Sequence, residues 1–294
     1  MEDVAQLRTQ RSSSRPRHVL SASVIYGLAI FFGLIALFPF YWAVISSLKT
    51  ESDLRFFPPA LLPNPPQWHN YSDLFALVPF ARWILNSVHI SVLATLGAVI
   101  SSTVVAYSFA RFRYPGRNLF FTLTIGTLIL PSEVTVVPTY LIMRDLKWLD
   151  TFNPLIVPSW FGGGAFYIFL LRQFLLTIPR DLDDAAKMDG ASSLRILIDI
   201  LAPICKPAIA TVAIISFLGH WDDFFGPLIY LNTPINYPLS LGIRSFSIMQ
   251  LTDGEPRTRL LMVAATIATL PPLAIFLAAQ RSFVQGFVMS GIKG

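Results

Sequence analysis

Apolar blocks alternate with polar connections along the whole chain. A helix needs about 20 predominantly apolar residues to cross the hydrocarbon core of a bilayer, and the blocks are close to that length or longer. The pattern therefore predicts an all-α integral membrane protein with six transmembrane helices. The expected helices cover residues 23–45, 84–110, 119–143, 154–176, 208–231 and 260–279.

Proline and glycine interrupt several of these blocks. Pro131 divides the third block, and Gly226-Pro227 follow a polar stretch in the fifth, so we expect breaks in both helices. The run Gly162-Gly163-Gly164 would allow neighbouring helices to approach closely. The connections over residues 46–82 and 232–256 are expected to be extracytoplasmic loops, and the first, which is rich in proline, to end in an interfacial helix.

The composition is that of a membrane protein. Hydrophobic residues make up 54% of the 294 positions and charged residues only 13%, whereas soluble domains carry roughly 25% charged residues. The mean hydropathy of +0.59 agrees. The net charge of +5 resides mostly at the ends of apolar blocks, which is an orientation signal and not a nucleic-acid-binding stripe. A single cysteine excludes an intramolecular disulfide.

Six spans place both termini on one side of the membrane, and most Lys and Arg lie in the connections on that side. Both termini are therefore expected in the cytoplasm. Residues 1–18 are interpreted as a disordered tail, 19–280 as the transmembrane domain and 281–294 as a C-terminal tail. The block over residues 23–45 is too long for the core of a signal peptide, which is the rival interpretation.

The cytoplasmic connection over residues 177–206 contains the most informative segment, Asp184–Ser193. Its first part has good helix formers, Gly190 suits the left-handed conformation that closes a helix, and Ser192 or Ser193 could cap a second helix. That second helix is expected to end before Pro203. Two helices this short cannot bury a core of their own, so they need a partner surface.

The order Asp-Ala-Ala-x-x-Asp-Gly-Ala in this segment resembles the EAA loop of ABC-transporter permeases, with Asp184 in place of the family's glutamate. An ordinary amphipathic cytoplasmic loop is the alternative. The resemblance implies a type I ABC importer permease fold, in which this loop is a coupling helix that docks on an ATPase subunit. The implied coupling residues are Asp184, Ala185, Ala186, Asp189, Gly190 and Ala191.

A second motif, Trp-Asp-Asp-Phe-Phe-x-Pro-Leu, begins at Trp221 and resembles the carbohydrate branch of these permeases, in the subunit similar to the second permease of maltose-type importers. Ionisable groups inside membrane spans are costly, so they mark candidate functional sites, and Asp222 and Asp223 with His220 are the densest such set. Asp222 and Asp223 could bind sugar hydroxyls, with Trp221 and Phe224 offering flat faces. Alternatively, the two aspartates could cap the helix break at Gly226-Pro227 or pin it against the neighbouring subunit. Glu133, beside Pro131, could line the same path or pin a broken helix.

The C-terminal residues, with Gly291 and Lys293, also resemble the tail of that permease, which contacts the ATPase interface; a frayed terminus is the alternative. No Gly-Lys dipeptide is present, which excludes a Walker A loop, and no spacing of histidines suggests a metal site. The chain is therefore not expected to be an enzyme.

The resemblance implies a multi-pass protein of the bacterial inner membrane that forms the translocation path for a sugar or sugar derivative. Its expected partners are a second permease, two ATPase subunits that bind ATP and Mg²⁺, an extracytoplasmic solute-binding protein and the lipid bilayer. No cofactor is expected in this chain. An ion-coupled secondary carrier and an ABC permease for a peptide or amino acid are the alternatives, although six spans without visible inverted repeats are unusual for a carrier.

Overall fold

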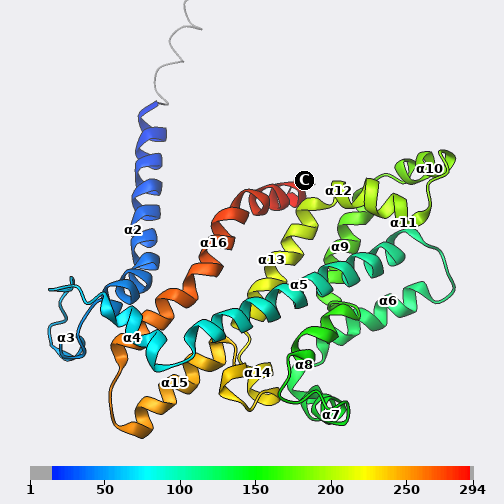
Figure 1. Ribbon diagram of the computed structural model, residues 1–294. Coiled ribbons are helices and arrows are strands. Elements are labelled where there is room, and N and C mark those ends of the chain that lie inside the picture. The colour runs from blue at the N-terminus through cyan, green and yellow to red at the C-terminus, as the bar shows by residue number, and fades with distance from the viewer. Residues whose placement is uncertain (1–14, 292–294) are drawn as a thin grey trace, which may run out of the picture. The chain divides into compact units, whose positions relative to one another are not determined.

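The computed structural model describes the backbone of residues 15–291, and its side chains except those of residues 15–23, 132–133, 253 and 280–291. All regular elements in this part of the chain are helical (Figure 1). In chain order they are α2 (Arg15–Ser47), α3 (Glu51–Arg55), α4 (His69–Leu77), α5 (Phe80–Arg111), α6 (Arg117–Gly126), the 3₁₀ turn η1 (Thr127–Ile129), α7 (Ser132–Asp145), α8 (Asn153–Ile156), the 3₁₀ turn η2 (Val157–Trp160), α9 (Ala165–Thr177), α10 (Asp181–Met188), α11 (Ser193–Arg195), the π-helix η3 (Ile196–Leu201), α12 (Ala202–Ile204), α13 (Lys206–Asp222), α14 (Phe225–Tyr230), the 3₁₀ turn η4 (Pro234–Asn236), α15 (Leu239–Asp253) and α16 (Thr258–Gly291).

Four helical stretches of the described chain are long and apolar enough to cross a membrane by themselves. They cover Val24–Ser47, Phe80–Arg111, Asn153–Thr177 and Thr258–Ala279. Two further candidates are bent pairs, Arg117–Ile129 with Val134–Asp145 at 104° and Ser193–Ile204 with Lys206–Asp222 at 82°. The expected count of six is reached when each bent pair is one span, and the first bend includes Pro131, where a break was expected.

Among the described residues, 15–71 and 257–266 form one compact unit. Inside it, the buried amide of Asn70 donates to the backbone oxygens of Ser47 and Lys49 at 2.8 and 2.9 Å, and accepts from the Arg259 guanidinium. The Lys49 side chain is also buried, with Nζ 4.3 Å from the centroid of a Trp42 ring. These polar groups hold the end of α2 to the beginning of α16, since buried polar groups are stable only when they are hydrogen-bonded.

The second unit, residues 72–256 and 267–291 of the described chain, is built around α5, which packs against α9, α13, α15 and the α8–η2 segment. Small residues on α5 allow this close packing. A Cβ at Gly97 would lie 2.5 Å from the Trp160 ring, and one at Gly163 would lie 2.5 Å from the backbone oxygen of Ala98. The glycine run of the fourth block therefore permits a close approach to α5, as its sequence indicated.

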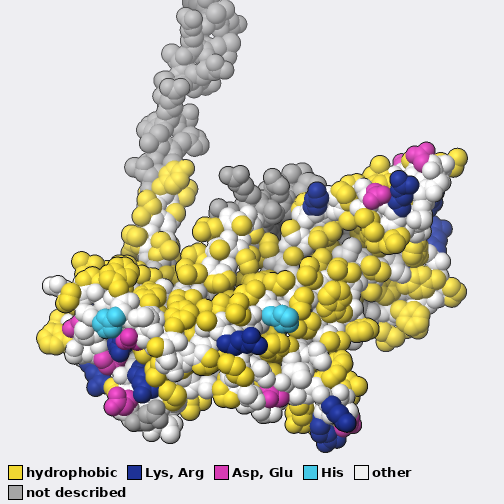
Figure 2. All heavy atoms as spheres, viewed as in Figure 1, with side chains coloured by type: hydrophobic (Ala, Val, Ile, Leu, Met, Phe, Trp, Pro, Cys, Tyr) yellow, Lys and Arg dark blue, Asp and Glu magenta, His cyan; other side chains and the backbone are white. Residues whose placement is uncertain are grey.

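Side chains exposed on the helices are largely apolar. Figure 2 shows hydrophobic side chains over much of the visible face of the helices, with charged groups gathered around α3 and α4, around α10 and near α7. On α6, for example, Leu119, Phe120 and Leu123 are 61%, 55% and 58% exposed. In water such surfaces would be unusual, and in a bilayer they are the expected lipid-facing or subunit-facing surfaces.

The expectation that residues 232–256 form a loop is wrong, because this segment contains α15, a helix of 15 residues. Leu239, Leu241 and Phe246 on this helix are buried. The apolar run is too short to cross a bilayer and includes polar residues, so its hydropathy resembles that of a loop. Helix α15 is stabilised by tertiary packing instead: a Cβ at Gly242 would lie 2.3 Å from the Trp83 ring of α5.

Three polar side chains near the beginning of α5 fix the connection before α15. The Trp83 indole donates to the Pro234 oxygen at 2.9 Å, and the Asn86 amide donates to the oxygens of Ile235 and Tyr237 at 2.9 and 3.0 Å. The Ser87 hydroxyl accepts from Leu239 N at 2.7 Å. These contacts satisfy backbone groups that would otherwise be unpaired where the chain leaves regular structure.

The expectation that the helix after Ser193 ends before Pro203 is also wrong. The π-helix η3 leads directly into α12, which contains Pro203, and the break occurs at Cys205. Proline is tolerated there because it occupies the first turn of a new helical segment, where its missing N–H costs least. At the two ends of the chain, α2 begins at Arg15, inside the expected disordered tail, and α16 continues as a helix to Gly291.

Asp150 links the connection after α7 to the connection after α14. Its carboxylate accepts from the backbone N–H groups of Asn232 and Thr233 at 3.0 Å each, and from the Thr233 hydroxyl. Its own N–H donates to the Tyr230 oxygen at 2.8 Å. The hydrogen bonds from Thr233 favour the ionised form and lower the Asp150 pKa from 3.8 to about 2.

Replacing Asp150 by Asn should remove the charge while keeping the left-handed backbone (φ 57°), which asparagine tolerates. Because the folded-state pKa is lowered, the stabilisation is present at neutral pH and is lost as the pH falls from about 4 towards 2. We expect about 1 kcal/mol, since solvent screens this partly exposed carboxylate. Thermal unfolding in detergent should show wild type and variant converging below pH 3; a constant difference between them would contradict this assignment.

Candidate coupling site and substrate path

Helix α10 has the charge pattern of a stable short helix. Asp181, Asp183 and Asp184 lie in its first turn and Lys187 in its last, which is the arrangement that the helix dipole favours. It ends in a Schellman motif, in which Gly190 N donates to the Lys187 oxygen and Ala191 N to the Ala186 oxygen, both at 2.9 Å.

Gly190 has φ +79°, and no heavy atom lies within 4 Å of the position that a Cβ would occupy. Backbone conformation alone therefore selects glycine, as predicted from the sequence. Ser192 is the N-cap of the next helix, and its hydroxyl oxygen accepts a hydrogen bond from the Arg195 backbone N at 3.4 Å. The turn between the two helices is thus the one that the motif predicted.

A buried ion pair attaches this loop to α5. Nε of Arg111, the last residue of α5, lies 2.9 Å from Oδ2 of Asp183, and the two side chains are only 6% and 7% exposed. Both terminal guanidinium nitrogens of Arg111 donate to the Ile178 oxygen at 3.2 Å. Sequence reasoning missed both residues of the pair, because they are separated by 72 positions and only the fold brings them together.

Two further hydrogen bonds support the attachment. Arg180 donates to the Ala110 oxygen at 3.1 Å, and the Tyr107 hydroxyl donates to the Ser193 oxygen at 3.1 Å. Below them lies a shared apolar core. The buried residues contributed to it by α5 and by the loop over residues 177–206 are Ala106, Tyr107, Phe109, Ala110, Ile178, Ala186, Ile196, Leu197, Leu201 and Cys205. The loop is therefore held rigidly on the end of α5.

The predicted coupling residues divide between two faces of the loop. Ala186 is buried in the core, and Ala191 packs against that core. Asp184 and Asp189 are exposed, and Asp184 pairs with Lys187 at 3.0 Å. Ala185 and Gly190 are exposed as well. The outer face also presents Met188, 88% exposed, and Leu182, 41% exposed, which the motif did not single out.

Asp222 and Asp223 have different surroundings despite being adjacent. The Asp223 carboxylate accepts from Gly226 N at 3.1 Å, and its backbone oxygen accepts from the Ser240 hydroxyl at 2.6 Å. It thus caps the beginning of α14, as the capping alternative expected. Asp222 is exposed and lines a cavity of about 290 Å³. The other residues of this cavity are Trp221, Leu239, Ser240, Ile243, Ala268, Thr269 and Pro272.

The two aromatic candidates are mainly packing residues. Trp221 is buried, stacks on Phe217 with ring centroids 5.8 Å apart, and donates from its indole N–H to the Ala268 oxygen at 3.2 Å. Phe224 packs against a core cluster that includes Ile90 and Leu155. Trp221 therefore gives the cavity an ordered wall, whereas Phe224 holds the break against α5 and α8.

Other candidates of the sequence lie elsewhere. Glu133 is the second residue of α7, and its side chain is outside the described part of the structure. Gly291 is the last residue of α16, and Lys293 lies outside the described residues. His220 donates a hydrogen bond from Nδ1 to the Ser216 backbone oxygen at 2.7 Å, and its Nε2 forms a hydrogen bond with the Ser159 hydroxyl at 3.3 Å. Among the described residues, no group of three or more His, Cys, Asp and Glu could hold a metal ion.

Arg111→Gln should leave the Asp183 carboxylate buried without its cation. Loss of one partner of a buried pair costs about 3 kcal/mol or more, whereas replacing both partners by apolar residues often restores stability. We therefore expect a large fall in the unfolding temperature for Arg111→Gln and partial recovery in the double variant Arg111→Met/Asp183→Leu. The component single variants Arg111→Met and Asp183→Leu complete the cycle. If their losses in thermal unfolding in detergent add up to the loss of the double variant, the pair is not coupled.

Comparisons with known proteins agree with this geometry. Residues 98–288 match the family model "Binding-protein-dependent transport system inner membrane component". The chain is 35% identical over 264 residues to the sn-glycerol-3-phosphate transport system permease protein UgpE of Yersinia pestis, covering 87% of this chain and 92% of that protein. It is 33% identical over 275 residues to UgpE of Agrobacterium fabrum, covering 91% and 96%.

A solved bacterial ABC transporter involved in the import of the acidic polysaccharide alginate has the same fold. One of its chains aligns with a TM-score of 0.78 and 23% identity, over 92% of this chain and 98% of that one. The all-helical permease architecture and the family inferred from the sequence are thereby confirmed, and the ion-coupled carrier is set aside. The chain belongs to the family of binding-protein-dependent transport system inner membrane components, and it is a multi-pass permease subunit of an ABC transporter.

Proposed function

We propose that this permease carries a sugar or sugar derivative and couples to its ATPase through the outer face of α10. The single observation that carries the coupling proposal is the combination of a rigid attachment and an apolar protrusion. Asp183 and Ala186 face inwards and are buried, whereas Met188 protrudes with 88% of its surface exposed. A large apolar side chain at that exposure on a cytoplasmic loop indicates a partner surface.

In the proposed cycle, the ATPase subunits bind ATP and Mg²⁺, and their closure displaces α10. Because the Arg111–Asp183 pair holds the loop to α5, this displacement moves α5 with it. Docking can drive the change only if the closed ATPases bind one permease conformation better than the other. The expected assembly contains a second permease, two ATPase subunits and an extracytoplasmic solute-binding protein, as the family description of binding-protein-dependent transport suggests.

The proposed substrate class is supported by the relatives and by the cavity beside Asp222. The relatives are named for sn-glycerol-3-phosphate transport, and the solved transporters for alginate. All these molecules are rich in hydroxyl or acidic oxygen groups. In the cavity, the Asp222 carboxylate and the Ser240 hydroxyl offer hydrogen-bond partners beside the apolar wall of Trp221, a combination that suits a hydroxylated solute.

Met188→Asp tests the coupling surface. A charge at the centre of an apolar contact should lower the affinity for the ATPase by at least about tenfold, while the fold stays intact because the side chain is exposed. The measurement is co-purification of the ATPase subunit with the full chain. Leu251→Asp is the matched control, since Leu251 is 81% exposed on α15. Equal co-purification in both variants would overturn the proposed docking surface.

Alanine substitutions at Asp222 and Asp223 should separate transport from stability. Asp223→Ala removes the acceptor for Gly226 N and should cost about 1 kcal/mol of unfolding free energy. Asp222→Ala should leave thermal unfolding unchanged and reduce solute uptake by the assembled importer. Normal uptake of the natural solute by Asp222→Ala would remove this cavity from the translocation path, while leaving the coupling surface untouched.

A further inference from the structure

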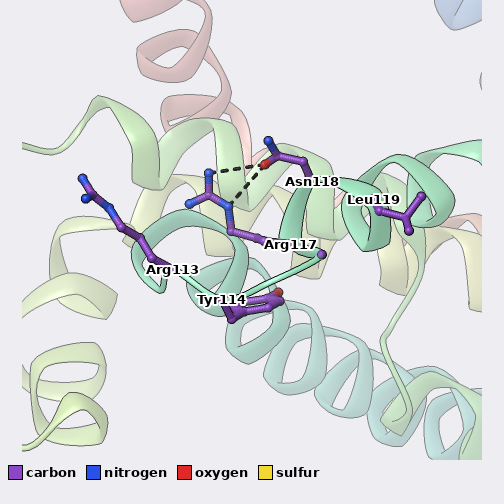
Figure 3. A pocket seen from close by; sticks show the side chains of 6 residues that line it. Arg113, Tyr114, Arg117, Asn118 and Leu119 are labelled. Atoms are coloured by element: carbon purple, nitrogen blue, oxygen red, sulfur yellow. Dashed lines mark hydrogen bonds between the residues drawn. The ribbon is translucent and has the colours of Figure 1, made fainter.

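The short turn between α5 and α6 contains a hollow that the transport function does not use. Its volume is about 300 Å³. Figure 3 shows the guanidinium groups of Arg113 and Arg117 extending on the same side of the turn, with Tyr114 below them and Asn118 beside Arg117. The lining residues are Arg113, Tyr114, Gly116, Arg117, Asn118 and Leu119, and none of them is acidic.

The positive charge of this hollow is not neutralised within the described residues. Arg111, at the end of α5, is paired with Asp183, but no carboxylate of the described residues forms an ion pair with Arg113 or Arg117. Arg117 donates to Asn118 Oδ1 at 3.3 Å and to the Phe112 oxygen at 3.2 Å. These neutral acceptors orient the guanidinium and leave its charge available.

Two neighbouring features increase the attraction for an anion. Helix α6, ten residues long, begins at Arg117, and its N-cap Gly116 (φ +80°) supplies no side-chain cap, so the positive end of the helix dipole faces the hollow uncapped. Arg172 of α9 stacks on the Phe121 ring at 4.0 Å and is close enough to Arg117 for the two charges to repel each other. An anion between these groups would relieve that repulsion.

The position of the hollow favours a lipid as the source of the anion. Candidate spans end at Arg111 and begin at Arg117, which places the turn at the membrane surface. Directly along α6 from the hollow, Leu119, Phe120 and Leu123 are all more than half exposed. The arrangement therefore combines guanidinium groups for a phosphate with an apolar surface for acyl chains.

We propose that the Arg113–Arg117 turn binds the phosphate of an anionic phospholipid, with the acyl chains lying along the exposed side of α6. The shared chemistry is a phosphate oxyanion held by two guanidinium groups. Free inorganic phosphate is the other possible source of that chemistry. This site is independent of the ATPase docking surface, because none of its lining residues belongs to α10.

The test measures phosphatidylglycerol retained by the purified full-length chain, by native mass spectrometry and by titration with vesicles of phosphatidylglycerol or phosphatidylcholine. The test variant is Arg113→Gln/Arg117→Gln. The control is Arg195→Gln/Lys206→Gln, which removes the same charge from exposed positions of the cytoplasmic connection. We expect the test variant to bind phosphatidylglycerol roughly ten- to thirtyfold more weakly and the control to bind within about twofold of wild type.

Unchanged thermal unfolding of both variants would show that the loss is not caused by misfolding. Equal phosphatidylglycerol binding by wild type and test variant would overturn the site, and so would an equal loss in the control, which would indicate only a general charge effect. Inorganic phosphate at millimolar concentration is added as a competitor. If it displaced the lipid from wild type but not from the test variant, the hollow would be a free-phosphate site, and the lipid proposal would be overturned. The expected result is a lack of such competition.

Discussion

The buried pair of Arg111 and Asp183 is the constraint on which the coupling architecture depends. Two charges removed from water are stable only while they remain together. A separation of α10 from the end of α5 that left either charge buried would therefore cost several kcal/mol. The two guanidinium hydrogen bonds to Ile178 add a backbone anchor just before the loop. A docked partner that moves the loop must therefore move α5.

Helix α5 is long enough to carry this movement across the membrane. Its 32 residues span about 48 Å at 1.5 Å per residue, which exceeds the roughly 30 Å hydrocarbon core. At the end opposite Arg111, Ser87 accepts from the N–H of Leu239, the first residue of α15. Leu239 and Ser240 also line the cavity beside Asp222. One helix thus contacts both the coupling loop and a wall of the proposed substrate path.

The break after α13 shows how one polar motif can serve two purposes. Helix α13 ends at Asp222, before the expected break at Gly226-Pro227, and these two residues lie in the first turn of α14. The Gly226 N–H, which has no helical partner there, is satisfied by the Asp223 carboxylate. The neighbouring carboxylate of Asp222 is then left at the cavity surface. The neighbouring Trp221 is held in place by its stack on Phe217 and by its hydrogen bond to the Ala268 oxygen of α16. The carboxylate that lines the cavity is therefore supported by residues whose own role is packing.

The local sequence by itself determined the helical spans, the break at Pro131 and the turn at Gly190. Each of these follows from a short-range cause: the length of an apolar block, the missing N–H of proline, or a left-handed backbone that only glycine adopts cheaply. The motif likewise indicated the family, since its spacing lies within one segment.

Only the tertiary structure decided which residues of these segments face inwards. Helix α15 could not be predicted because its stability comes from Trp83 and its neighbours on α5, more than 150 positions away from the segment that they hold. The sequence could not predict the ion pair of Arg111 with Asp183 for the same reason. Nor could it predict that Asp223 would accept a backbone hydrogen bond while Asp222 lines a cavity. Burial and pairing depend on contacts between distant segments, and hydropathy along the chain does not record those contacts.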